Sequence, residues 1–211
     1  MREIMSRLFP RQDRDCVPLV IGDGDSESGS RLGGLPPAGV TPNRLTSLTK
    51  YFCTIRVAED PVLEISVFLS FDFAGMADGA GVVHTSGDLF EVVTHGDSTR
   101  SIKSALASEL TPHPILHGQE CADKLVDDDG NEIVISHHKL GGRPFIQDSG
   151  EGLPALVRSL REEGYFQIVQ IAFPDAHDGD VDGDWPFAVG MFHLFGEEPI
   201  DKCSWRCFWE Y

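Results

Sequence analysis

The sequence predicts an α+β fold in which two related halves, each made mostly of antiparallel strands, are flanked by a few helices. Three observations lead to this prediction: a glycine motif that occurs twice, stretches of alternating apolar and polar residues, and two segments with helical periodicity. Apolar residues make up 41% and charged residues 24% of the 211-residue chain, which is ordinary for a globular protein with a sizeable core. We therefore expect a single compact domain over residues 1–211.

The repeated motif is a basic residue followed by Leu-Gly-Gly-x-Pro. It occupies residues 31–36 and recurs 108 positions later, in residues 139–144. Two adjacent glycines followed by a proline specify a tight backbone path, because glycine tolerates positive φ and proline fixes its own φ. The expected structural residues are Leu32, Gly33, Gly34 and Pro36 in the first copy and Leu140, Gly141, Gly142 and Pro144 in the second.

The segments that follow the two copies are also alike. Residues 64–73 alternate between apolar and polar side chains, as expected of a half-buried strand, and residues 165–173 are their expected counterpart. Two further segments, each a glycine, two apolar residues and a histidine, end at His84 and at His193. We infer an internal duplication with halves of about residues 30–110 and 125–211, which would place the two histidines at equivalent positions.

The remaining elements complete the expected layout. Residues 11–42 are rich in Gly, Ser, Pro and Asp and are expected to form loop. Helices are expected over residues 101–110 and 154–163, where apolar residues recur at helical spacing. Further strands are expected over residues 88–93, 132–136 and 204–211, the last with Trp205, Cys207, Trp209 and Tyr211 on one face.

This order of features resembles the YwqG-like bacterial family over about residues 30–211. That family carries the motif twice, and its second copy opens onto a strand that contains glutamine, as Gln167 and Gln170 do here. The resemblance implies a duplicated α+β fold without established catalytic residues, and relatives look like proteins found among immunity genes beside bacterial toxins. The sequence departs from the family in its shorter, more irregular first half and its expanded acidic loop.

The charge balance is strongly acidic, with 17 basic and 34 acidic residues and a net charge of −17. Such a chain repels nucleic acid phosphates and anionic membranes and attracts basic partners, although solubility alone explains the charge equally well. No run of about 18 apolar residues occurs, and the five cysteines have no disulfide-framework spacing. We expect a cytoplasmic protein that binds neither nucleic acid nor membrane.

The first functional hypothesis is a non-catalytic immunity (antitoxin) protein. It would bind and neutralise a cognate bacterial toxin, expected to be a nuclease, because a nuclease needs a basic cleft to which an acidic surface is steered. The residues expected to contact this toxin are Asp175, Asp178, Asp180, Asp182 and Asp184, followed by Asp127, Asp128, Asp129, Glu197 and Glu198.

The alternative is a small-ligand or metal-binding protein with a cleft between the halves, lined by the glycine loops, His84 and His193. Residues 178–183 match the first half of a calcium loop, but Val189 stands where a bidentate glutamate is required. We therefore assign no metal ligands and no cofactor. The Gly-x-Ser-x-Gly, Walker A and His-Glu-x-x-His patterns are all missing from the sequence, so we expect no catalytic residues and no enzymatic activity.

Overall fold

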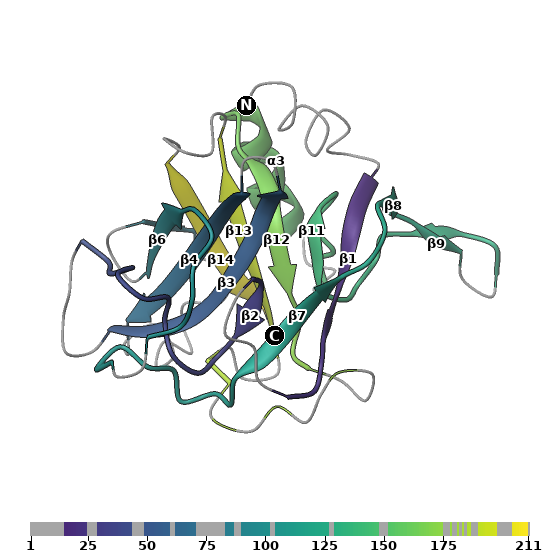
Figure 1. Cartoon of the computed structure of the whole chain (residues 1–211). Coiled ribbons are helices and arrows are strands. Elements are labelled where there is room, and N and C mark those ends of the chain that lie inside the picture. The colour runs from purple at the N-terminus through teal and green to yellow at the C-terminus, as the bar shows by residue number, and fades with distance from the viewer. Residues whose placement is uncertain are drawn as a thin grey trace.

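The computed structural model describes most of the chain as one curved antiparallel sheet with a single helix among the described residues (Figure 1). No described helix has the length and apolar character needed to cross a membrane. The described residues are 15–24, 29–43, 49–59, 62–70, 83–86, 90–101, 104–126, 129–147, 152–174, 178, 181, 183, 185–186, 190–197 and 204–210.

The main sheet has twelve strands in the order β5-β14-β13-β12-β11-β1-β7-β2-β3-β4-β6, with β8 paired to β1. A separate pair is formed by β9 (Leu125–Val126) and β10 (Glu132–Ile133). The strands of the main sheet are β1 (Asp15–Ile21), β2 (Arg31–Leu32), β3 (Thr49–Glu59), β4 (Val62–Ser70), β5 (His84–Thr85), β6 (Phe90–His95), β7 (His113–His117), β8 (Cys121–Ala122), β11 (Lys139–Gly141), β12 (Phe166–Ile171), β13 (Met191–Gly196) and β14 (Trp205–Glu210).

The sheet is nearly closed. Its two end strands, β5 and β6, follow one another directly in the chain, so the sheet must curl round to bring its ends back together. In Figure 1, β3 and β4 accordingly lie in front of β13 and β14. Apolar side chains fill the space between, where the Phe52 ring of β3 lies 5.5 Å from the Phe192 ring of β13.

The predicted fold class is therefore wrong, because the part of the chain that the structure describes is a mostly antiparallel, barrel-like sheet with one short helix instead of an α+β fold with several. The helix expected over residues 101–110 is not present in the described residues 104–110, which form turns and bends. There the Ser104 and Ser108 hydroxyls accept hydrogen bonds from the backbone N–H groups two residues on, which favours turns over helix. The Leu106 carbonyl accepts a hydrogen bond from Tyr51 N of β3.

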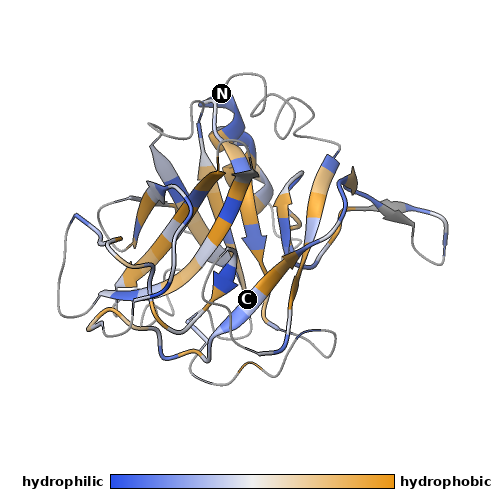
Figure 2. Ribbon diagram, viewed as in Figure 1, coloured by the Kyte–Doolittle hydropathy of each residue, from blue (hydrophilic) through white to orange (hydrophobic). Residues whose placement is uncertain are grey.

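The other predicted helix is confirmed as α3 (Gly152–Glu162). Its buried residues Leu153, Val157 and Leu160 pack on an aromatic cluster formed by Tyr165, Phe195 and Phe208. In Figure 2 the strands carry most of the hydrophobic colouring, whereas α3 shows mainly hydrophilic residues. The helix therefore covers one patch of the outer face of β13 and β14.

Two strands lie in the segment predicted to be loop, residues 11–42. β1 occupies a central place in the sheet, where residues 16–18 pair with β11 and residues 19–21 pair with β7. β2 joins β7 to β3. These strands connect the two halves, and the largest buried apolar cluster contains residues of both.

The two halves follow the same strand order, β2-β3-β4-β6 in the first and β11-β12-β13-β14 in the second. This agreement supports the duplication, which stays a prediction. We expected residues 165–173 to be the counterpart of the strand over residues 64–73. In the observed order β12, which lies in residues 165–173, corresponds instead to β3. His84 lies in β5, outside both series, whereas His193 lies in β13, so this strand order does not support the predicted equivalence of the two histidines.

The glycine pairs of the two motif copies share one backbone conformation. Gly33 and Gly34 have φ of 65° and 70°, and Gly141 and Gly142 have φ of 72° and 74°. The first pair is covered by residues 110–112, because a Cβ atom on Gly33 would meet the Thr111 carbonyl oxygen. Both copies therefore give a neighbouring segment room to approach the backbone.

Candidate functional site

Asp178, a leading candidate for toxin contact, is used inside the protein. Its side chain is 6% exposed and accepts hydrogen bonds from Ile21 N at 3.0 Å and from His138 Nε2 at 2.9 Å. His138 Nδ1 accepts a hydrogen bond from Ala172 N, so the ring proton is on Nε2 and Nε2 is the donor to Asp178. Contrary to the prediction, Asp178 does not offer a free carboxylate to a partner.

Two other predicted acidic residues are described and accessible. Asp129 is exposed between β9 and β10. Glu197, at the end of β13, accepts hydrogen bonds from the Ser204 hydroxyl and backbone N–H, which hold the pKa of its carboxyl below the usual value. The remaining candidates lie outside the described residues: Asp127, Asp128, Asp175, Asp180, Asp182, Asp184 and Glu198.

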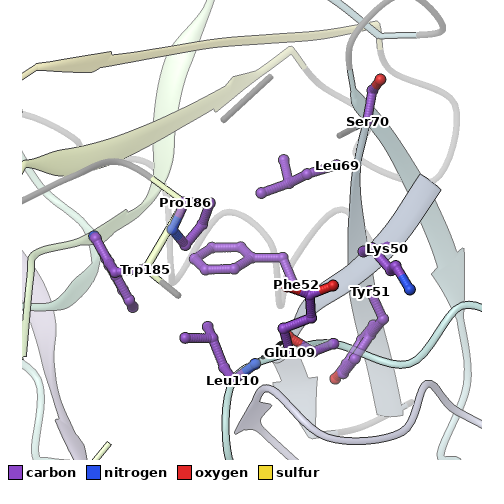
Figure 3. Close-up of a pocket in the computed structure, with 10 residues that line it drawn as sticks. Lys50, Tyr51, Phe52, Leu69, Ser70, Glu109, Leu110, Trp185 and Pro186 are labelled. Atoms are coloured by element: carbon purple, nitrogen blue, oxygen red, sulfur yellow. Dashed lines mark hydrogen bonds between the residues drawn. The ribbon is translucent and has the colours of Figure 1, made fainter. Parts of the chain in front are cut away.

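A cavity of about 140 Å³ lies between the first half and the segment that precedes β13 (Figure 3). Its walls are mostly apolar, and the charged side chains beside them are Lys50 and Glu109. The apolar lining comes from four segments and includes Phe52, Leu69, Leu110, Trp185 and Pro186. The cavity occupies the kind of position predicted for a cleft between the halves, but His193, which was expected to line that cleft, does not line it.

Aromatic rings fix the shape of this cavity. The Trp185 ring meets the Phe52 ring edge-on, with centroids 5.7 Å apart, and meets the Phe173 ring at 5.9 Å. Edge-to-face contacts of this kind are favourable beyond the area that they bury. The walls therefore suit a small apolar or aromatic group.

The first glycine motif positions one cavity wall. Gly34 N donates a hydrogen bond to the Leu110 carbonyl at 3.0 Å, and Ser108 N donates to the Gly34 carbonyl at 2.8 Å. The alternative function predicted that the motif glycines line the cleft. In the structure Gly34 instead lies behind Leu110, so this prediction is wrong for the first copy.

His193, the other predicted cleft residue, belongs to a buried polar network. Its Nε2 lies 3.0 Å from Glu210 Oε1 and its Nδ1 lies 3.4 Å from Gln167 Oε1. The second Glu210 oxygen accepts a hydrogen bond from Gln147 N. Burial lowers the pKa of His193, although the bond to Glu210 opposes this shift. These contacts occupy the polar atoms of His193, so we assign the network a structural role.

The basic residues of the two motif copies are both buried but have different partners. Lys139 Nζ donates to both carboxylate oxygens of Asp123, at 2.9 and 3.1 Å, and both side chains are fully buried. Arg31 is 1% exposed, and its Nη1 donates to the Gly29 carbonyl at 2.7 Å. Within the described residues, its Nε and Nη2 have no hydrogen-bond partner.

Within the part of the chain that the structure describes, no three His, Cys, Asp or Glu side chains lie close enough to hold a metal ion. Sequence patterns could not indicate the cavity, because its walls come from segments far apart in the chain. Comparison with protein-family models, curated proteins and solved structures found no significant match.

Proposed function

We propose that the protein is a non-catalytic immunity protein that binds and neutralises a toxin with a basic surface. The net charge of −17 supports this proposal. Among the described residues two cations and four carboxylates are buried, namely Arg31, Lys139, Glu64, Glu91, Asp123 and Glu210. These account for −2, so −15 of the net charge belongs to the rest of the chain. A surplus of this size accelerates encounter with a basic protein.

The acidic segment over residues 175–184 remains the leading candidate for the contact, without Asp178. Two contacts attach this region to the body of the protein. Ile21 N of β1 donates a hydrogen bond to the Asp178 carboxylate, and the Trp185 ring packs against the Phe52 ring. An attached segment loses less conformational freedom on binding than a free one, which favours affinity.

The proposal is tested with the product of a neighbouring toxin gene. We expect the two proteins to co-elute at low salt and the complex to weaken as salt rises, because long-range charge attraction is screened. Asp180→Asn/Asp182→Asn should weaken binding by about tenfold, the effect of about 1.4 kcal/mol. Glu162→Gln/Glu163→Gln is the matched control, since it removes the same charge from exposed positions at the end of α3.

Two results would contradict the immunity function. One is failure to co-elute at low salt together with failure to suppress the toxicity of the neighbour. The other is unchanged binding as salt rises together with no effect of either double substitution, since the acidic charge would then play no part. Equal weakening by the two double substitutions would instead exclude residues 175–184 as the contact, because only the total charge would matter.

The cavity favours a second candidate function, the binding of a small apolar or aromatic molecule. A ligand that binds only the folded state raises the melting temperature. We expect indole, used as a probe, to raise the melting temperature of the unchanged protein but not of Leu110→Phe, which fills the cavity. Leu116→Phe, a substitution at an exposed position on β7, is the control. An equal response of all three proteins to indole would exclude the cavity as the site.

A further inference from the structure

Two cysteines that are 105 positions apart in the sequence lie directly opposite one another in the sheet. Cys16 of β1 pairs with Cys121 of β8 in an antiparallel ladder. Opposite residues in such a ladder have Cα atoms about 4.5 or 5.5 Å apart, which is within the range of about 4.4–6.8 Å that a disulfide spans. Both cysteines are free thiols, and the Cys121 thiol is close enough to contribute to the raised pKa of Cys16.

The two thiols differ in accessibility. Cys121 is exposed, whereas Cys16 is 3% exposed. Burial raises the pKa of the Cys16 thiol, and the nearby Asp123 carboxylate raises it further. A dissolved reagent can therefore reach Cys121, while Cys16 stays protonated beside it. The other described cysteines, Cys53 of β3 and Cys207 of β14, are fully buried.

We propose that Cys16 and Cys121 form a thiol–disulfide exchange site for small-molecule disulfides such as oxidised glutathione. The Cys121 thiolate attacks one sulfur of the small disulfide, forms a mixed disulfide and releases one small thiolate. Cys16 then attacks the Cys121 sulfur. The Cys16–Cys121 bond forms, and the second small molecule leaves as a thiol that carries the Cys16 proton. The protein is oxidised by two electrons, and the small disulfide is reduced to two thiols.

The bond would secure the segment that connects the two halves. Cys121 is two residues before Asp123, the carboxylate that neutralises the buried Lys139. β1 lies between β11 and β7, at the centre of the sheet. Oxidation would therefore join this central strand covalently to the segment that supplies the Lys139 counter-ion, and reduction by a small thiol would release it.

The test uses the full chain carrying Cys203→Ser, which removes a thiol outside the described residues and leaves four cysteines. The folded protein is treated with oxidised glutathione, quenched with acid, unfolded and alkylated. We expect the number of alkylated cysteines to fall from four to two, and peptide mass spectrometry to find residues 16 and 121 cross-linked. A lasting glutathione adduct at Cys121 with Cys16 still alkylated would overturn the proposal, as would four alkylated cysteines.

Three variants in the same background separate the two steps. Cys16→Ser removes the second thiol, so a glutathione adduct should persist at Cys121. Cys121→Ser should leave all three remaining cysteines alkylated, because Cys16 is buried. Cys53→Ser, the matched control, should fall from three alkylated cysteines to one. The cross-link itself is measured without these variants, so a folding defect in Cys16→Ser would not obscure the result.

Discussion

Replacing each buried motif cation by methionine should lower the free energy of unfolding by very different amounts in the two halves. Arg31 and Lys139 hold the same position in the motif, and neither is more than 1% exposed. Lys139 faces the buried Asp123 carboxylate, whereas the Arg31 guanidinium, within the described residues, makes one hydrogen bond, to the Gly29 carbonyl. Methionine keeps an unbranched apolar stem and carries no charge, so each substitution removes the electrostatic contacts while retaining much of the packing of the stem.

Lys139→Met should lower the free energy of unfolding by about 3–5 kcal/mol, because it leaves the Asp123 charge buried without its cation. Asp123 also accepts a hydrogen bond from Arg143 N, so it cannot turn away without further loss. Arg31→Met removes one hydrogen bond, worth about 1 kcal/mol. It also removes two buried nitrogens, Nε and Nη2, that have no hydrogen-bond partner among the described residues and whose burial costs a comparable amount. We expect a net change within about 1 kcal/mol.

Urea unfolding of the two variants measures this difference. The slope of the free energy of unfolding against urea concentration should be unchanged, which indicates that both variants still unfold in two states. The double variant Lys139→Met/Asp123→Asn is the control and should be less destabilised than the sum of its single changes, since no charge is left unpaired. Equal costs for Arg31→Met and Lys139→Met would refute the reasoning, because the Asp123 pair would then contribute nothing specific.

Three further predictions concern stability. Gly142→Ala should lower the free energy of unfolding by about 2 kcal/mol or more, since the φ of Gly142 is positive and the new Cβ would meet the Asp123 carboxylate. Gly130→Ala is the control: its φ is 82° but the space around it is open, so the loss in urea unfolding should be about 1 kcal/mol. Burial lowers the pKa of His95 and of His193, which faces Glu210. At a pH just below the unperturbed histidine pKa of 6.5, the unfolded chain therefore binds more protons than the folded protein. Stability should therefore fall as the pH drops below about 6.5, and His193→Gln should reduce this slope in unfolding measured at several pH values. Leu160→Ala should lower the free energy of unfolding by about 2–4 kcal/mol, because it leaves a cavity beneath α3. Ser159→Ala, on the exposed side of the helix, should lower it by less than about 0.5 kcal/mol, and thermal unfolding measures both.

The elements that could be predicted are those with a long, unbroken period. Alternation over residues 64–73 predicts β4, and apolar residues at helical spacing predict α3. In α3 the signal arises because one side of the helix is buried. β4 is buried on both faces, so the prediction of a half-buried strand is wrong about exposure. Its alternation separates the apolar core side from the side of Glu64 and Ser66, whose polar groups are hydrogen-bonded by Arg56 and Thr54. The structure confirms that Trp205, Cys207 and Trp209 share a face of β14, since all three belong to the same core cluster.

The missed elements have weak or interrupted periods. β1 contains Pro18, and its two ends pair with different strands, so no single pattern extends along it. Strands of two residues, such as β5 and β8, have no period at all. The fold class differs from the prediction because the helix expected over residues 101–110 is not present in the described residues 104–110, and because β1 and β2 join the strands into one sheet. These pairings are contacts between residues that are distant in the sequence.

The candidate sites were obscured for the same reason. A run of aspartates predicts exposure, yet Asp178 pairs with His138, a residue 40 positions earlier that gives no local sign of the contact. The cavity and the Cys16–Cys121 pair likewise depend on which strands become neighbours. Local composition could indicate the charge of the surface but not which carboxylates remain on it.

The repeated glycine motif has a structural role that is separate from binding. In the first copy Gly33 lies against Leu110 and the Thr111 carbonyl, and in the second Gly142 lies against Asp123 and Cys16. Each glycine pair is thus covered by another segment of the same chain and offers little surface to a partner. Substitutions in the motif should therefore change stability first. Substitutions of exposed carboxylates should change binding while leaving the free energy of unfolding nearly constant, which separates the two roles experimentally.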